Sequence, residues 1–142
     1  MEKEKFVPVT KLQNDLLTEK YTEIHFVAGD NSDSPTRFLV IKSNDDDAFA
    51  KIQAFAENKN VPNGSICEIK FQDGAIKENG VNGVMNEDLI AMVIARLAHW
   101  QTTEFKCREN AVAITKLEES LMWLRKRTVN RERRGVEGTH GI

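Results

Sequence analysis

The sequence lacks the features that mark membrane and secreted proteins. Its 142 residues include only two cysteines, Cys67 and Cys107, and no run of about eighteen apolar residues that could span a bilayer. The first residues, MEKEKFVPV, have no apolar segment of the kind found in a signal peptide. Because two cysteines without a signal peptide suit a reducing compartment, we expect a soluble, cytoplasmic protein.

Common catalytic and metal-binding motifs are also missing from the sequence. It contains no P-loop, GxGxxG, HExxH, GxSxG or CxxC. The three histidines, His25, His99 and His140, are scattered, and acidic pairs such as Glu118-Glu119 are typical of a solvated face. We therefore expect a protein that is not an enzyme and that needs no metal and no cofactor.

What is present predicts an α+β fold. The composition, 40% hydrophobic and 30% charged, is that of a globular domain. Runs rich in β-forming residues predict the strands of a small N-terminal antiparallel sheet, at residues 21–28, 37–42 and 66–72. Residues 43–60 predict a helix capped by Ser43 or Asn44, because five apolar residues recur there every three or four positions. These residues are Ala48, Phe49, Ile52, Phe55 and Ala56.

The C-terminal part predicts a hairpin of two helices, at residues 86–101 and 105–134. The apolar seam expected on the second helix consists of Ala111, Ile114, Leu117, Leu121 and Leu124. Gly135, followed by apolar Val136, stands where a helix-ending glycine belongs. We expect one domain, residues 1–142, with an α+β part over 1–83 and a helical hairpin with a basic tail over 84–142.

Basic residues gather at the end of the second predicted helix. Residues 125–142 hold six Lys and Arg against Glu132 and Glu137, a net charge of +4, so that the rest of the chain carries −6 of the total of −2. The helix dipole favours cations by about 0.3–1 kcal/mol each, but only in the last turn. One stripe holds Trp123, Arg127, Arg131 and Arg134. Since guanidinium groups bind phosphate through paired donors, the cluster predicts an anion site, and a plain solvated helix end is the alternative.

A second group of candidate residues lies at the corner between the two predicted helices. Trp100 and Phe105 flank the break, and Arg108 and Asn110 begin the second helix. An aromatic face can stack a nucleobase and an Asn amide can read its edge. The alternative is that the two rings only close the core and that Arg108 and Asn110 belong to the helix start.

The two groups are too far apart to meet within one chain. Asn110 and Arg127 are 17 residues apart, which is about 25 Å along one helix. If both contact one small ligand, two chains must pack antiparallel about a two-fold axis and share two equivalent pockets. The hairpin is then the part of the chain that mediates oligomerisation.

Three stretches of the chain carry a resemblance to a known family. They are IKFQDGAIKENGVNGVMNEDL (69–89), EFKCRENAVAITKLEESLMWL (104–124) and RKRTVNRERRGVEGTH (125–140). They resemble the phage Thoeris anti-defence proteins, which share a C-terminal helical hairpin with the anti-CBASS sponges.

The resemblance implies a binding protein with a nucleotide-derived ligand. Members of the family sequester cyclic ADP-ribose isomers made by bacterial TIR-domain proteins, leave the ligand intact and so block Thoeris immunity in the infected host cell. Some members form hexamers rather than dimers, with separate sites for the cyclic di- or trinucleotides of CBASS immunity. The preferred isomer and the choice between homodimer and hexamer stay open.

Carried over to this chain, the resemblance implies an aromatic platform at Trp100, an amide at Asn110 that reads the base or ribose, and pyrophosphate contacts at Arg127 and Arg133. It leaves the division of roles among Arg127, Arg131, Arg133 and Arg134 open. Phe105 and Arg108 complete the candidate site as neighbours.

Two other functions remain in competition. The basic helix also suits an RNA- or DNA-binding module, although the acidic remainder of the chain argues against a nucleic-acid polymer as partner. A phosphodiesterase or NAD-glycan hydrolase acting on the same ligand needs a general acid–base pair or a metal site. The sequence shows no cluster that would serve as either.

Overall fold

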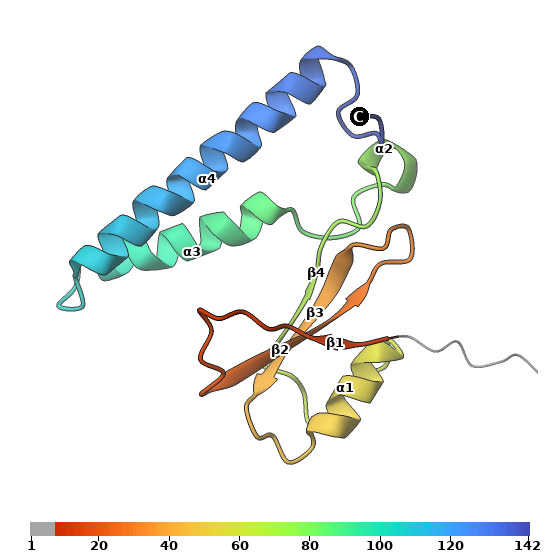
Figure 1. Ribbon diagram of the computed structural model, residues 1–142, viewed down its shortest axis with the longest axis vertical. Coiled ribbons are helices and arrows are strands. Elements are labelled where there is room, and N and C mark those ends of the chain that lie inside the picture. Colours follow the sequence, from red (N-terminus) through yellow and green to blue (C-terminus); the bar gives the residue numbers. More distant parts are fainter. Residues whose placement is uncertain (1–7) are drawn as a thin grey trace, which may run out of the picture. The chain divides into compact units, whose positions relative to one another are not determined.

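The computed structural model describes residues 8–142, which divide along the chain into two compact units, one ending at Asp73 and the other beginning at Gly74 (Figure 1). The sequence predicts the boundary within the chain between residues 83 and 84. The structure instead shows a short helix before that point, α2 (Ile76–Asn79), which bonds to the C-terminal tail. That contact assigns the segment after Asp73 to the second unit.

The first unit is built on a four-stranded antiparallel sheet in the order β1-β2-β3-β4. The strands are β1 (Thr10–Lys11), β2 (Thr22–Ala28), β3 (Pro35–Lys42) and β4 (Cys67–Lys70). With the helices that follow, this confirms the predicted α+β class. The sequence did not indicate β1, because two residues carry no pattern and the strand exists only through its pairing with Phe26 and His25.

Helix α1 (Ala48–Ala56) packs on one face of this sheet. The core consists of Val27, Leu39, Ile41 and Phe55. The predicted caps at Ser43 and Asn44 are wrong, because Asn44 adopts a left-handed turn (φ 60°) and the helix begins at Ala48. The predicted apolar stripe is also wrong at Phe49, which is 83% exposed, while Lys51 is buried.

The second unit is dominated by a hairpin of α3 (Asn86–Trp100) and α4 (Arg108–Arg133). Helix α4 begins three residues later than predicted, because the Gln101 side chain bonds the Cys107 backbone in both directions (3.0 and 3.1 Å) and holds the corner as a loop. Gly135 ends the helix as predicted, with φ 73° and a hydrogen bond from the Val136 N–H to the Arg131 carbonyl (3.0 Å).

The hairpin is thinly packed. The predicted seam residues Ile114, Leu117, Leu121 and Leu124 are only half-buried, and Ala111 is exposed. Among the residues that the structure describes, none in α3 or α4 is fully buried. Two helices alone cover only the strip along which they touch, so a large part of the apolar surface remains open.

Over residues 8–142, no helix is both long and apolar enough to cross a membrane. Both cysteines carry free thiols.

Candidate functional site

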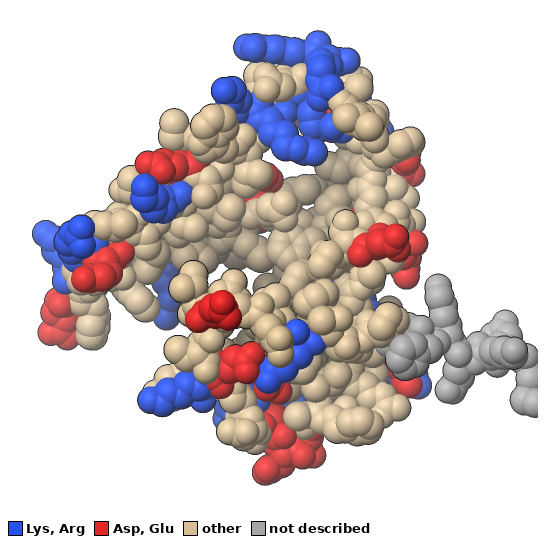
Figure 2. Space-filling model, viewed as in Figure 1, with Lys and Arg blue, Asp and Glu red and all other residues tan. Residues whose placement is uncertain are grey.

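The end of α4 and the tail that follows it border an open cavity of about 600 Å³. Lys and Arg side chains gather around this end of the helix (Figure 2). The cavity is lined by Trp123, Lys126, Arg127, Asn130, Arg131, Arg134, Gly141 and Ile142. All four residues of the predicted stripe are among them, because positions 123, 127, 131 and 134 lie on one face of a continuous helix.

Arg127 is the arginine of this cavity that is open to a ligand. Its side chain is exposed, and within the described part of the chain it forms no hydrogen bond and no ion pair. The ammonium of Lys126 lies 4.8 Å from the ring centroid of Trp123, which is 68% exposed. A cation with free donors beside an exposed indole and a second cation can hold a phosphate group and a flat ring together.

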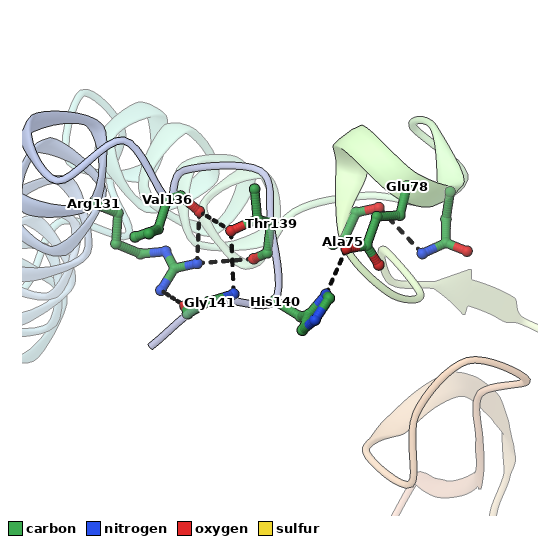
Figure 3. Close-up of polar contacts among 8 residues, drawn as sticks. Ala75, Glu78, Arg131, Val136, Thr139, His140 and Gly141 are labelled. Carbon is green, nitrogen blue, oxygen red and sulfur yellow. Dashed lines mark hydrogen bonds and ion pairs between the residues drawn. The ribbon is translucent and has the colours of Figure 1, made fainter.

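The guanidinium of Arg131 is already hydrogen-bonded to the C-terminal tail of the same chain (Figure 3). Its guanidinium donates to the carbonyl oxygens of Gly141 (2.8 Å), Thr139 (2.9 Å) and Val136 (3.0 Å). These three contacts fold the tail back against the end of α4. Arg131 therefore shapes the wall of the cavity in this structure rather than offering free donors to it.

The tail is also tied to α2. The Lys77 N–H donates to the Gly138 carbonyl (2.8 Å), and His140 Nδ1 lies 2.5 Å from Glu78 Oε1. Gly138 has φ 74°, and a Cβ there would stand 3.1 Å from Lys77 Cγ. The segment from Gly135 to His140 thus closes the second unit and brings Gly141 and Ile142 to the cavity wall.

The other two candidate arginines, Arg133 and Arg134, differ from each other. Arg134 lines the cavity and donates to the Ile142 carbonyl. Arg133 is exposed and lies outside the cavity lining. It follows Arg127 by six positions, which places it about 240° around the helix. The structure therefore does not bring Arg127 and Arg133, the pair implied by the resemblance, to one face.

The other candidate residues lie at and next to the corner between the helices. The guanidinium of Arg96 lies 4.8 Å from the ring centroid of the half-buried Trp100. Phe105 is 67% exposed, and Arg108 is exposed. Cys107 caps α4, with its sulfur accepting from the Asn110 backbone N–H (3.4 Å), so the Asn110 side chain is not needed as the cap.

The two groups stay separate within the chain. Helix α4 runs without a break from Arg108 to Arg133 and carries Asn110 near one end and Arg127 near the other. The distance of about 25 Å predicted from the sequence therefore applies.

The sequence-based list missed two side chains that line the cavity, Lys126 and Asn130. Asn130 follows Arg127 by three positions and precedes Arg134 by four, so helical spacing alone could have found it. Among the described residues, no group of three or more His, Cys, Asp or Glu side chains is placed to hold a metal ion.

Comparison with known proteins identifies the helical part of the chain. The sequence profile described as "Acb2/Tad1, hairpin domain" matches residues 63–129. Residues 63–129 are thus similar to the Acb2/Tad1 hairpin domain. The curated relative "Thoeris anti-defense 1" of Bacillus phage SBSphiJ7 is 68% identical over 77 residues.

These matches confirm the resemblance to the phage Thoeris anti-defence family. The match to the relative covers 54% of this chain and 54% of the relative, so the chain spans about half the length of that protein. The matched residues 63–129 contain α3, the corner and most of α4. Most of the first unit precedes them.

Proposed function

We propose that this is a phage anti-defence protein that sequesters a signalling molecule of bacterial immunity, and that the molecule is a cyclic ADP-ribose isomer made by TIR-domain proteins. The relative with the name Thoeris anti-defense 1 and the Acb2/Tad1 hairpin domain support the anti-defence role. The observation that carries the ligand class is the exposed Arg127, unpaired within residues 8–142, beside Lys126 and the exposed indole of Trp123.

In this proposal the pyrophosphate lies against the basic end of α4. Arg127 supplies paired N–H donors to one phosphate, and Lys126 supplies a second positive charge. Arg134 lies at the same cavity and reaches the ligand once its contact with the Ile142 carbonyl opens. Tight binding with a slow off-rate is enough for sequestration, so no chemical step is required.

The adenine and ribose are held at the corner of a second copy of the chain. Trp100 and Phe105 provide rings for stacking, Asn110 provides the amide that reads an edge, and Arg108 adds a cation. Because about 25 Å of α4 separates these residues from Arg127, only an antiparallel dimer places both ends on one ligand. The thinly packed hairpin supplies apolar surface for that dimer, and further association of dimers gives hexamers with sites for CBASS cyclic oligonucleotides.

The decisive experiment is isothermal titration of the full chain with a cyclic ADP-ribose isomer, followed by heat denaturation and chromatography of the released ligand. We expect tight binding near one ligand per chain and recovery of the intact ligand. A chemically altered ligand would instead establish an enzyme. No heat of binding by a folded protein would exclude the proposed ligand.

Nucleic-acid binding by the same basic helix is the second candidate function. It predicts affinity that falls steeply with salt and grows with the length of the polymer. Fluorescence anisotropy with RNA and DNA of several lengths tests it. A length-independent, weak signal is expected, because the chain outside the basic end is acidic.

A further inference from the structure

The first unit holds a second and larger cavity, of about 920 Å³, between the sheet and α1. Its lining includes residues of β2, β3 and α1, and most of them precede residues 63–129, the part similar to the Acb2/Tad1 hairpin domain. Its size lies in the range of about 300–1,000 Å³ that is usual for small-molecule sites. None of the residues assigned to the proposed sequestration site belongs to it.

Two cations face each other at this cavity. Arg37 of β3 and Lys70 of β4 are directly opposed across the two strands, and both line the cavity. Like charges in opposed positions destabilise a sheet. In the described chain neither side chain forms an ion pair, so no internal anion compensates this arrangement.

Arg37 is held in position before any ligand arrives. Its Nη1 donates to the Phe55 carbonyl (3.0 Å) and lies 3.5 Å from Asn58 Oδ1, and its guanidinium carbon is 4.9 Å from the Phe55 ring centroid. The other two guanidinium nitrogens form no hydrogen bond within residues 8–142. A cation that is already held in place and has unused hydrogen-bond donors binds an anion with little further loss of side-chain entropy.

None of the acidic residues described at the cavity forms an ion pair with Arg37 or Lys70. The carboxylate of Asp73 accepts from the backbone N–H groups of Asp30 (2.7 Å) and Asn31 (3.1 Å). Glu57 lies 2.9 Å from Lys59, whose ammonium holds the pKa of that carboxyl below its ordinary value. The side chain of Asp30 is exposed to solvent.

An apolar wall completes the cavity. Phe49 lies on α1 at a position that the helical pattern assigns to the core, yet it is 83% exposed and lines this cavity. Ile52 and Val9, which also pack on the core, continue the same wall. The amide side chains of Gln53 and Asn58 lie at the same cavity and can orient a ligand.

We infer that this cavity binds a small organic anion, whose carboxylate or phosphate lies between Arg37 and Lys70 and whose flat apolar body lies against Phe49 and Ile52. The bound anion compensates the opposed cations, and the body covers the exposed ring. This site is independent of the one proposed at α4, and it survives the failure of that proposal.

The test is titration of the full chain with two probes, 2-naphthoate as the carboxylate and adenosine 5′-monophosphate as the phosphate. Their neutral counterparts, 2-naphthalenemethanol and adenosine, serve as controls. We expect at least one anion to bind about tenfold or more tightly than its neutral counterpart, because charge-assisted hydrogen bonds strengthen the contact. The stronger of the two anions identifies which acid the site takes.

Variants assign the binding to this cavity. Lys70→Gln and Phe49→Ala should each weaken the binding by about tenfold, whereas Lys42→Gln, an exposed lysine on β3 outside the cavity, should not. Arg127→Glu removes anion binding at α4 and should leave this signal unchanged. Binding that is lost in Arg127→Glu and kept in Lys70→Gln would overturn the inference. So would the absence of binding by either anion to a chain shown to be folded by its melting curve.

Discussion

At the scale of single residues, arginines that look equivalent in the sequence have different surroundings in the structure. Arg131 donates to three carbonyl oxygens of the tail, whereas Arg127 is exposed and unpaired in the described chain. Arg133 points away from the cavity that both of them line. Free donors and a place at the cavity, rather than charge alone, decide which of them can bind a ligand there.

Arg127→Glu should abolish binding of the cyclic ADP-ribose isomer and leave the fold intact. The change removes a charge-assisted contact worth about 1.5–3 kcal/mol and adds repulsion of the phosphate, so a loss of at least tenfold is expected. Isothermal titration measures it. Arg133→Glu makes the same charge change on the other side of the helix and should retain binding. Equal effects of the two variants would show that the cavity does not select between them.

Gly29→Ala should destabilise the first unit. A Cβ at this position would stand 2.4 Å from Asp73 Oδ1, and the Asp73 carboxylate accepts the Asp30 N–H at 2.7 Å. Forcing these groups apart is expected to lower the free energy of unfolding by about 1–3 kcal/mol. Urea denaturation measures the change. In an Asp73→Ala background the same substitution should be much less harmful, and additive effects would contradict the proposed clash.

At the scale of elements, the start of α1 depends on an ion pair rather than on the predicted caps. Lys51 Nζ lies 2.6 Å from Asp45 Oδ2, with 10% and 12% of the two side chains exposed. This hydrogen bond, together with one from the Asp47 N–H, holds the pKa of Asp45 below its ordinary value. The charged form of Asp45 is therefore favoured in the folded state.

Asp45→Asn should weaken the dependence of stability on pH. A carboxyl whose pKa is lowered by folding stabilises the protein above its unfolded pKa, about 3.9, and loses that contribution as the pH falls through the lower folded pKa. The free energy of unfolding should thus fall less steeply below about pH 4 in the variant. Urea denaturation at pH 7, 5 and 3 measures it. Asp46→Asn, at the exposed neighbouring position, serves as the control, and identical pH profiles for all three proteins would refute the role of the pair.

The end of α4 depends on a side chain that reaches past the helix. Arg131→Lys keeps the charge but loses the planar fork that serves three carbonyl oxygens. Lysine can keep one of the three contacts, and roughly 1 kcal/mol is lost with each of the other two, so hydrogen exchange in residues 136–141 should become faster by about thirtyfold. Mass spectrometry follows this exchange. Unchanged protection of the tail would show that α2 alone holds it.

At the scale of the whole molecule, exposed apolar side chains suggest association of the hairpin. Met92, Val93, Val112 and Met122 are between 43% and 70% exposed. Light scattering coupled to size exclusion should give a dimer or a hexamer. Val112→Glu should shift the protein towards the monomer because it places a charge in the apolar contact. Lys106→Glu, in the exposed corner loop, is the matched control. A wild-type monomer at micromolar concentration would exclude the shared pocket.

The sequence by itself determined the parts of the fold that local patterns encode. Strands β2, β3 and β4, the two long helices and the stop at Gly135 lie close to their predicted positions. Each depends on side-chain periodicity or on the backbone freedom of one glycine, which act over a few residues. The stripe of Trp123, Arg127, Arg131 and Arg134 was predictable for the same reason.

Only the tertiary structure decided which further elements form and which side chains are exposed or already bonded. The two-residue strand β1, the late start of α1 and the short α2 depend on partners far away in the chain or on turns without a period. The exposure of Phe49 and the opposition of Arg37 and Lys70 arise from packing and strand register. The occupation of Arg131 by the tail is of the same kind. A local pattern specifies which way a side chain points, but only the folded chain specifies what it meets there.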